Sequence, residues 1–260
     1  MKRPYVVKSA SNMPIQAPAF QDPNVPYDCP DLKSLCVYGR TTPEIMKKYL
    51  APTPFEYISD IFIAYVCDYS NSSDTDGYTH GFFDTGIMIP VKYKGIVGAN
   101  ILFEYENYDY AILSGRELWG YPKKYAKASM KEQDGKVVAS VVKNDIKLIY
   151  LEIDLNSKLE TPIPKMKWYP HLQLHVVPKA SGQGIFSMRM ISRDTSPDFK
   201  KKSLIEGKGT MVLQGDDYNP LDEFSPIEIL GATYEVGDYF ATDENGWGKV
   251  IDEIIYDPEK

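Results

Sequence analysis

Short apolar runs bounded by turn-forming residues follow one another through most of this 260-residue chain. The runs predicted as strands are Ile61–Val66, Ile87–Tyr93, Asn100–Tyr105, Tyr110–Ser114, Lys136–Val142, Ile146–Leu155, Gln173–Val177, Gly184–Ile191, Thr210–Leu213 and Ile227–Glu235. One segment has a helix start, with Thr41 as N-cap followed by Pro43 and Glu44, and this helix is predicted to end near residue 50. Strands at this spacing with almost no long helical periodicity favour an antiparallel barrel or sandwich.

Bulk properties narrow the class of protein. The chain has no internal repeat and no linker-like stretch, so we predict a single domain over residues 1–260, with residues 1–36 as an irregular N-terminal arm. The net charge of −7 disfavours a general nucleic-acid binder. No run approaches the roughly 18 apolar residues of a membrane helix, and no signal peptide is recognisable. We therefore expect a cytoplasmic protein with neither a nucleic-acid nor a membrane partner.

Cysteines and histidines give no sign of a metal site. The three cysteines are widely spaced, which predicts neither a disulfide framework nor a zinc motif. His171 and His175 share one face of a predicted strand, but no third ligand is evident. His80 lies in a polar loop and is a candidate lid residue. We therefore expect no metal.

Two adjacent lysines, Lys123 and Lys124, follow a Gly/Pro turn and aromatic residues. A lysine amine is normally protonated near neutral pH, and both removal from water and a nearby positive charge lower its pKa. Two like charges about 4 Å apart cost roughly 4 kcal/mol at an effective dielectric near 20. We expect Lys124 to supply this charge, and Trp119, Tyr121 and Tyr125 to exclude water. A neutral amine in a pocket forms Schiff bases with carbonyl compounds, although the spacing alone is also typical of a solvated turn.

The run Gly115-Arg116-Glu117, followed by Tyr121-Pro122-Lys123-Lys124, resembles the signature of the acetoacetate decarboxylase family. Weaker similarity extends from about residue 16 to 240. The resemblance implies a mainly β (α+β) fold: a closed antiparallel β-barrel with peripheral sheets and a few helices. It also implies a homo-oligomer and a cofactor-independent lyase, in which Lys123 is the Schiff-base nucleophile and Lys124 adjusts its pKa.

The acidic residues that the family carries in its pocket differ here. Asp84 stands where the family commonly has a glutamate, although an isolated loop aspartate is also typical of a turn cap. Phe62 is the nearest equivalent of a second pocket glutamate. Glu104 lies where the family often has an apolar pocket residue, and it faces the pocket or the solvent according to the strand register.

Arg116 and Glu117 are more typical of an ion pair or a backbone anchor than of direct catalysis. The family's substrate-facing arginine has no counterpart near Asp31–Lys33. The predicted catalytic residues are Lys123, Lys124 and Asp84. The predicted substrate contacts are Phe62, Glu104, Tyr121, Trp119 and Arg116.

Three functions follow from these residues. The first is a Schiff-base-forming lyase that acts on a β-keto acid or a related carbonyl compound. The second uses the same imine for aldolase or dehydratase chemistry on a 2-oxo acid, because the changed acids affect the steps after imine formation. The third is a non-catalytic barrel that binds a small ligand.

Overall fold

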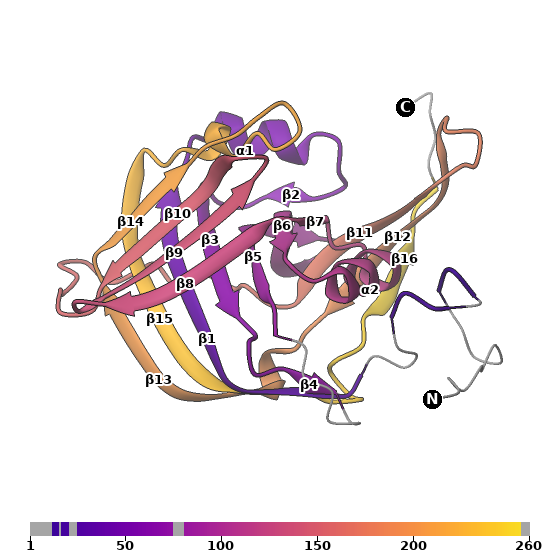
Figure 1. Cartoon of the computed structure of the whole chain (residues 1–260). Helices are drawn as coiled ribbons and strands as arrows, with labels where there is room; N and C mark the ends of the chain where they lie inside the picture. The colour runs from indigo at the N-terminus through magenta and orange to yellow at the C-terminus, as the bar shows by residue number, and fades with distance from the viewer. Residues whose placement is uncertain (1–11, 16, 21–24, 75–80, 256–260) are drawn as a thin grey trace, which may run out of the picture.

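The protein is described from a computed structural model, in which residues 12–15, 17–20, 25–74 and 81–255 are placed (Figure 1). The candidate lid residue His80 lies outside the described residues. Twelve strands form a large sheet and four form a smaller one. The main path of the large sheet contains, in spatial order, β13 (Phe199–Gly207), β15 (Glu228–Ala241), β1 (Tyr27–Arg40), β3 (Ile61–Asp68), β5 (Phe83–Tyr93), β6 (Ile96–Glu106), β11 (His171–Pro178), β12 (Ile185–Arg193) and β16 (Lys249–Glu253).

Three short strands pair beside this path: β2 (Glu56–Tyr57) on β5, β4 (Ser73–Asp74) on β1, and β7 (Lys123–Tyr125) on β6. The smaller sheet contains, in spatial order, β14 (Gly209–Leu213), β10 (Ile146–Asp154), β9 (Lys136–Lys143) and β8 (Lys127–Gln133). Two α-helices, α1 (Pro43–Leu50) and α2 (Asp109–Trp119), and two 3₁₀ turns, η2 (Ser196–Asp198) and η3 (Leu221–Phe224), complete the described elements. The fold is therefore mainly β with few helices, as predicted.

The prediction of a closed barrel was wrong. Neither sheet closes on itself in the part of the chain that the structure describes, because the end strands β13 and β16 each pair with one neighbour. The link between β6 and β11 is parallel and contains a single residue pair, Ala99 and His171. Beyond that link, β11, β12 and β16 extend away from the body of the molecule instead of returning to β13 (Figure 1).

The smaller sheet packs on one face of the large sheet, and the main core lies between them (Figure 1). Alternation along each strand decides which side chains enter this core. On β3, for example, Phe62, Ala64 and Val66 belong to the main core, whereas Ile63 and Tyr65 belong to a second cluster on the opposite face. That opposite face, partly covered by α2, carries the site described below.

Several predicted boundaries differ from the structure. Helix α1 begins one residue later than predicted, because the Thr42 hydroxyl, and not that of Thr41, accepts the cap hydrogen bond from Ile45 N at 3.4 Å. Strand β1 starts at Tyr27, so the predicted irregular arm over residues 1–36 extends too far. Residues 110–114, predicted as a strand, belong to the first half of α2. A run of four or five apolar residues does not distinguish a strand from a helix.

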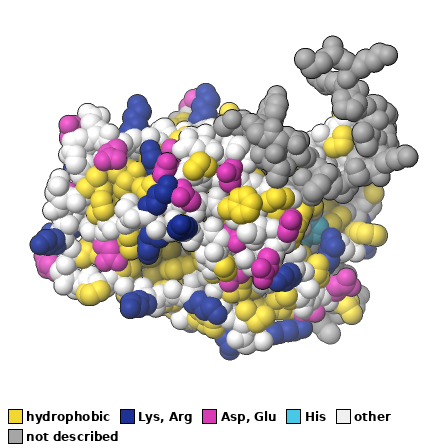
Figure 2. All heavy atoms as spheres, turned by 90° about the horizontal axis from the view of Figure 1, so that it is seen from below, with side chains coloured by type: hydrophobic (Ala, Val, Ile, Leu, Met, Phe, Trp, Pro, Cys, Tyr) yellow, Lys and Arg dark blue, Asp and Glu magenta, His cyan; other side chains and the backbone are white. Residues whose placement is uncertain are grey.

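Polar strands were missed altogether. Strand β13 carries three consecutive exposed lysines, Lys200–Lys202, and was not among the predicted strands. Seen from below, acidic and basic side chains are interspersed with hydrophobic ones, so this face has no continuous field of one sign (Figure 2). Among the described residues, the longer helix, α2, has 11 residues, and no helix combines the length and apolar character needed to cross a membrane.

Candidate active site

Strand β7 brings Lys123 beside two glutamates of β6. The two strands are parallel, with Glu104 opposite Lys123 and Glu106 opposite Tyr125. Because Glu104 and Glu106 are two residues apart, they point to the same face of the sheet, while Tyr105 between them points into the main core. Asp84 on β5 lies opposite Glu106 and completes a group of three acids.

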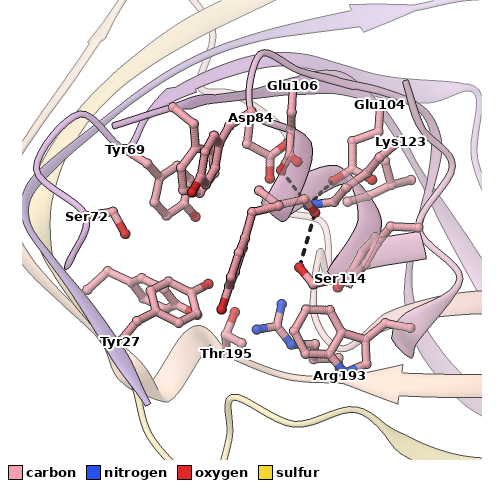
Figure 3. A pocket seen from close by; sticks show the side chains of 18 of the residues that line it. Tyr27, Tyr69, Ser72, Asp84, Glu104, Glu106, Ser114, Lys123, Arg193 and Thr195 are labelled. Carbon is pink, nitrogen blue, oxygen red and sulfur yellow. Dashed lines mark hydrogen bonds and ion pairs between the residues drawn. The ribbon is translucent and has the colours of Figure 1, made fainter. Parts of the chain in front are cut away.

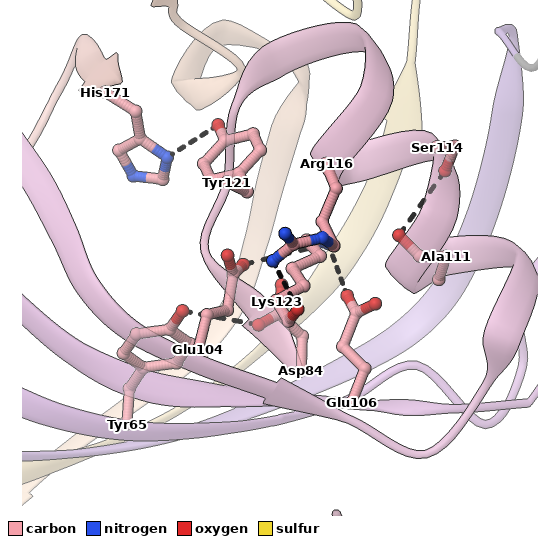
Figure 4. A network of polar contacts seen from close by, with 10 residues as sticks. All are labelled: Tyr65, Asp84, Glu104, Glu106, Ala111, Ser114, Arg116, Tyr121, Lys123 and His171. Carbon is pink, nitrogen blue, oxygen red and sulfur yellow. Dashed lines mark hydrogen bonds and ion pairs between the residues drawn. The ribbon is translucent and has the colours of Figure 1, made fainter. Parts of the chain in front are cut away.

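The three carboxylates enclose the amine of Lys123 (Figure 4). Lys123 Nζ donates a hydrogen bond to Glu106 Oε1 and lies 3.7 Å from Glu104 Oε1. One oxygen from each of the three acids lies within 4.8 Å of the others. The side chains of Lys123, Glu104 and Glu106 are 10%, 1% and 0% exposed, so the cluster is almost completely removed from water. The Tyr65 hydroxyl donates to Asp84 Oδ1 at 3.3 Å from the neighbouring strand.

This cluster has the donors and spacing of a site for a hard cation, which prefers carboxylate oxygens. In the described residues no other group of three His, Cys, Asp or Glu side chains has such a spacing. The ammonium group of Lys123 already supplies a positive charge among these oxygens. The predicted histidine pair is used differently: His171 Nδ1 lies 3.1 Å from the Tyr121 hydroxyl, and His175 Nε2 lies 2.8 Å from the Glu117 carbonyl oxygen.

The glycine and arginine of the signature position the lysine strand. A Cβ atom on Gly115 would lie 2.5 Å from Lys123 Cε, so only glycine leaves room for the lysine side chain beneath α2. Arg116 Nη1 donates to the Lys123 carbonyl oxygen at 3.0 Å. Gly120 ends α2 in the left-handed conformation with φ 74°, which turns the chain toward β7.

The expected effect of Lys124 on Lys123 is corrected by the geometry. Successive side chains of a strand point to opposite faces, so the two amines diverge. Lys124 Nζ donates to the Tyr218 carbonyl oxygen at 2.6 Å and to Asn219 Oδ1 at 3.2 Å, outside the acid cluster. Burial and the charge of Lys143 lower the pKa of Lys124 itself. Lys124 therefore does not bring its charge beside Lys123.

Electrostatics favour a protonated Lys123. Burial alone would lower the pKa of Lys123, but Glu106, Glu104 and Asp84 together outweigh it and raise that pKa above its usual range. Burial raises the pKa of Glu106 to about 8 although Lys123 opposes the rise, and burial raises the pKa of Glu104 well above its usual range. Glu106 therefore becomes ionised, and able to accept a proton from the amine, as the pH rises through about 8.

A pocket of about 110 Å³ opens beside the cluster (Figure 3). A single water molecule needs roughly 10–15 Å³ on this measure, so the pocket has room for a small organic molecule. Aromatic side chains form much of its wall, including Tyr69, Phe82, Trp119, Tyr121 and Tyr239. Lys123 is therefore reached through a partly apolar space of small-molecule size.

The structure places most of the predicted site residues at the pocket. Lys123, Asp84, Glu104, Trp119 and Tyr121 all line the pocket. The exposed residue Arg116 acts on the Lys123 backbone and is not part of the pocket lining.

Phe62 does not line the pocket, and its prediction as a substrate contact is corrected. Its ring is completely buried in the main core, where it meets the Phe224 ring at 5.7 Å. Glu106 was missed, although it lies two residues after Glu104 on the same predicted face. Because side chains alternate along a strand, Glu106 must face the same side as Glu104. Once the strand register places Glu104 in the pocket, Glu106 follows.

The fold and the site together define a class: mainly β proteins that bury a lysine amine inside a carboxylate cluster at the wall of a small pocket. The sequence model of one family, described as acetoacetate decarboxylase (ADC), matches residues 12–245. The chain belongs to this family.

Relatives of known name agree with this membership. The acetoacetate decarboxylase of Paraburkholderia phytofirmans is 26% identical over 264 residues, which cover 98% of this chain and 96% of the relative. That of Burkholderia vietnamiensis is also 26% identical and covers 99% of this chain and 98% of the relative.

Solved structures resemble the fold at lower identity. A structure from studies of acetoacetate decarboxylase has a TM-score of 0.81 at 20% identity and covers 98% of this chain and 100% of its own. The enduracididine biosynthesis enzyme MppR complexed with pyruvate has a TM-score of 0.75 at 13% identity and covers 94% and 97%. At these identities the likeness shows the fold alone.

Proposed function

We propose that this chain is a cofactor-independent, Schiff-base-forming lyase that acts on a β-keto acid or a related carbonyl compound through Lys123. The observation that carries the proposal is the buried contact between Lys123 and Glu106 at the wall of a small pocket. Such a contact provides a nucleophile and a base in one place. Family membership supports an enzymatic role, since the relatives described above are decarboxylases.

The first step makes the amine reactive. Lys123 transfers a proton to the ionised form of Glu106, which is populated as the pH rises through its pKa of about 8. Burial reduces the cost of forming the resulting pair, because an uncharged amine and an uncharged acid both avoid the cost of a desolvated charge. In this pocket the amine is therefore activated by an adjacent base and not by the charge of Lys124.

The second step forms the imine. The amine attacks the carbonyl carbon, the C–N bond forms, and the carbonyl oxygen leaves as water after taking protons from the amine and from Glu106. The product is a positively charged iminium, so Glu104 and Asp84 stabilise the charge that the ammonium carried before. In a β-keto acid the C–C bond to the carboxylate then breaks, carbon dioxide leaves, and its electron pair forms an enamine. A proton from an acid of the cluster and a water molecule release the ketone and restore Lys123.

A second candidate function is aldolase or dehydratase chemistry on a 2-oxo acid. The observation that favours it is the presence of several carboxylates beside the amine, because a base next to an iminium can remove the adjacent C–H proton. MppR, which resembles this chain in fold, is described in a complex with pyruvate.

Borohydride trapping tests the proposal. Incubation with acetoacetate or pyruvate followed by reduction is expected to leave on Lys123 the alkyl group formed by reduction of the imine, whose added mass is located by peptide mapping against its neighbour Lys124. Release of carbon dioxide from acetoacetate then favours the decarboxylase, and its absence with a trapped pyruvate adduct favours the aldolase or dehydratase. Ligand binding without an adduct from any carbonyl compound would point to a non-catalytic binding protein.

The proposal includes a homo-oligomer in the cytoplasm. Size-exclusion chromatography with light scattering measures the subunit number, and a monomer at micromolar concentration would contradict this part.

A further inference from the structure

A second cation, Arg193, lies in the pocket at the end of β12. Its Nε donates to the Gly246 carbonyl oxygen at 2.6 Å, and its guanidinium carbon lies 4.0 Å from the centroid of the Trp119 ring. These two contacts fix the side chain. Figure 3 shows the guanidinium group pointing into the pocket near Thr195, on the side opposite Lys123.

This guanidinium is incompletely paired. Its Nη2 is buried and has no hydrogen-bond partner among the described residues. Arginine stays protonated in proteins, so the group cannot relieve the deficit by losing its charge. A buried donor without an acceptor destabilises the folded protein, and does so more strongly when it is charged. A carboxylate is the ligand that satisfies a guanidinium best, because it accepts two parallel hydrogen bonds.

The pocket is electrostatically divided. Three carboxylates surround Lys123, so an anionic group of a ligand is repelled from that end. Tyr121 lies between the two cations: its ring centroid is 5.5 Å from Lys123 Nζ, and Arg193 is close enough to oppose the rise of the Tyr121 pKa to about 12 that burial causes. Among the described residues that line the pocket, Lys123 and Arg193 are the only lysine and arginine.

We propose that Arg193 is an anion anchor, and that the substrate is a keto acid whose retained carboxylate binds Arg193 while its keto carbon reaches Lys123. This inference rests on the proposed imine chemistry and names its substrate class. Decarboxylation moves the electron pair of the departing carboxylate toward the imine, and a fixed cation paired to that carboxylate opposes the movement. The anchored carboxylate is therefore one that stays in the product, separated from the carbonyl by a spacer.

The experiment compares two methyl ketones that differ only in charge. Levulinate carries a carboxylate beyond a short methylene spacer, and levulinamide is its neutral counterpart; neither loses carbon dioxide. For each ketone, the concentration that gives half-maximal borohydride trapping on Lys123 is measured at neutral pH. The wild-type protein is expected to prefer levulinate by about tenfold or more, which corresponds to about 1.4 kcal/mol, because a charge-assisted hydrogen bond is stronger than a neutral one.

Arg193→Gln is expected to reduce the levulinate-to-levulinamide preference to about unity. Arg189→Gln is the matched control, because Arg189 is on the same strand but contacts His175 and does not line the pocket; it is expected to keep the wild-type preference. Arg193→Lys, which keeps the charge but loses the bidentate geometry, is expected to give an intermediate preference and serves where near-UV circular dichroism shows that Arg193→Gln does not fold. Equal trapping of the two ketones by the wild type, or an undiminished preference in the folded Arg193 variants, would overturn the anchor.

Failure of the imine chemistry is recognised separately. If the wild-type protein gives no adduct with either ketone, the proposed function fails, and calorimetry with pentanoate and pentanamide then decides the anchor without any reaction. Binding of pentanoate over pentanamide that is lost in Arg193→Gln and kept in Arg189→Gln supports the anchor. Equal binding of the two compounds, or no binding of either, contradicts it.

Discussion

Glu106 controls whether Lys123 can lose its proton, because it is the acid in direct contact with the Lys123 amine. Burial raises the pKa of Glu106 to about 8. As a base it acts only when ionised, so imine formation is expected to increase as the pH rises through about 8. Glu106→Gln removes this ionisation and is expected to abolish the increase. The check is the initial rate of borohydride trapping with levulinate from about pH 6 to pH 9.5. An increase that persists in the variant assigns it to another group.

Gly115 offers a test of space at the same site. Gly115→Ala puts a methyl group 2.5 Å from Lys123 Cε and forces the lysine away from Glu106. We expect a loss of stability of about 1–3 kcal/mol from overpacking and at least a tenfold lower rate of Lys123 trapping. Glu117→Ala, an exposed change in the same helix, is the control for general effects on α2. A trapping rate equal to that of the control would show that Lys123 does not need this space.

Individual residues also show how far sequence reasoning reached. The family resemblance located Lys123, which lies within the signature, and Asp84, which stands where the family commonly has a glutamate. Both predictions depend only on local order along the sequence. The relation between Lys123 and Lys124 was misjudged because a turn was assumed where β7 is a strand, and a strand separates adjacent side chains. Glu106 depends on the register between β5, β6 and β7, which no local pattern encodes.

At the scale of elements, predictions succeeded where composition and periodicity agree. The predicted strands Lys136–Val142 and Ile146–Leu155 are confirmed as the paired strands β9 and β10, and the residues between them, Asn144 and Asp145, both have positive φ. Helix α2 was missed because its first half is an apolar run and its end lies within the signature. Polar strands such as β13 were missed because they carry no apolar alternation. Closure of the sheet into a barrel was inferred from the resemblance. In the described residues, however, the distant end strands β13 and β16 do not pair, so the sheet stays open.

Strand β3 allows a test of which face serves the pocket. Phe62 faces the main core and Tyr65 faces Asp84. A substitution of Phe62 should therefore change mainly the stability, and a substitution of Tyr65 mainly the rate of Lys123 trapping. Phe62→Leu is expected to lower the free energy of unfolding by about 1–2 kcal/mol through lost packing and to leave Lys123 trapping unchanged. Tyr65→Phe is expected to slow trapping severalfold, with a stability change within about 1.5 kcal/mol. Slower trapping in Phe62→Leu, with stability preserved, would indicate that Phe62 contacts the substrate after all. Both quantities come from urea titrations and trapping rates on the same samples.

For the whole molecule, the buried acid cluster predicts how stability depends on pH. The pKa of Glu106 rises from 4.5 to about 8 on folding, chiefly through burial. Between these values the folded protein holds a proton on Glu106 that the unfolded chain has released, so the contribution of Glu106 to the free energy of unfolding decreases as the pH rises, by at most about 1.4 kcal/mol per pH unit. The raised pKa of Lys123 affects stability only at higher pH. Its contribution to the free energy of unfolding is fully present below the ordinary lysine pKa of about 10.4 and is lost only as the pH rises through the pKa of the folded state.

The measurement is urea unfolding at about pH 5.5, 6.5 and 7.5. The wild-type protein is expected to lose more stability across this series than Glu106→Gln, because the glutamine side chain does not titrate. Glu132→Gln, an exposed change on β8, is the control and should follow the wild type. A pH dependence of stability that is the same in Glu106→Gln as in the wild type would mean that Glu106 is ionised without cost in the folded protein. The proton transfer from Lys123 to Glu106 would then lose its physical basis, because that transfer requires a carboxylate that binds a proton near neutral pH.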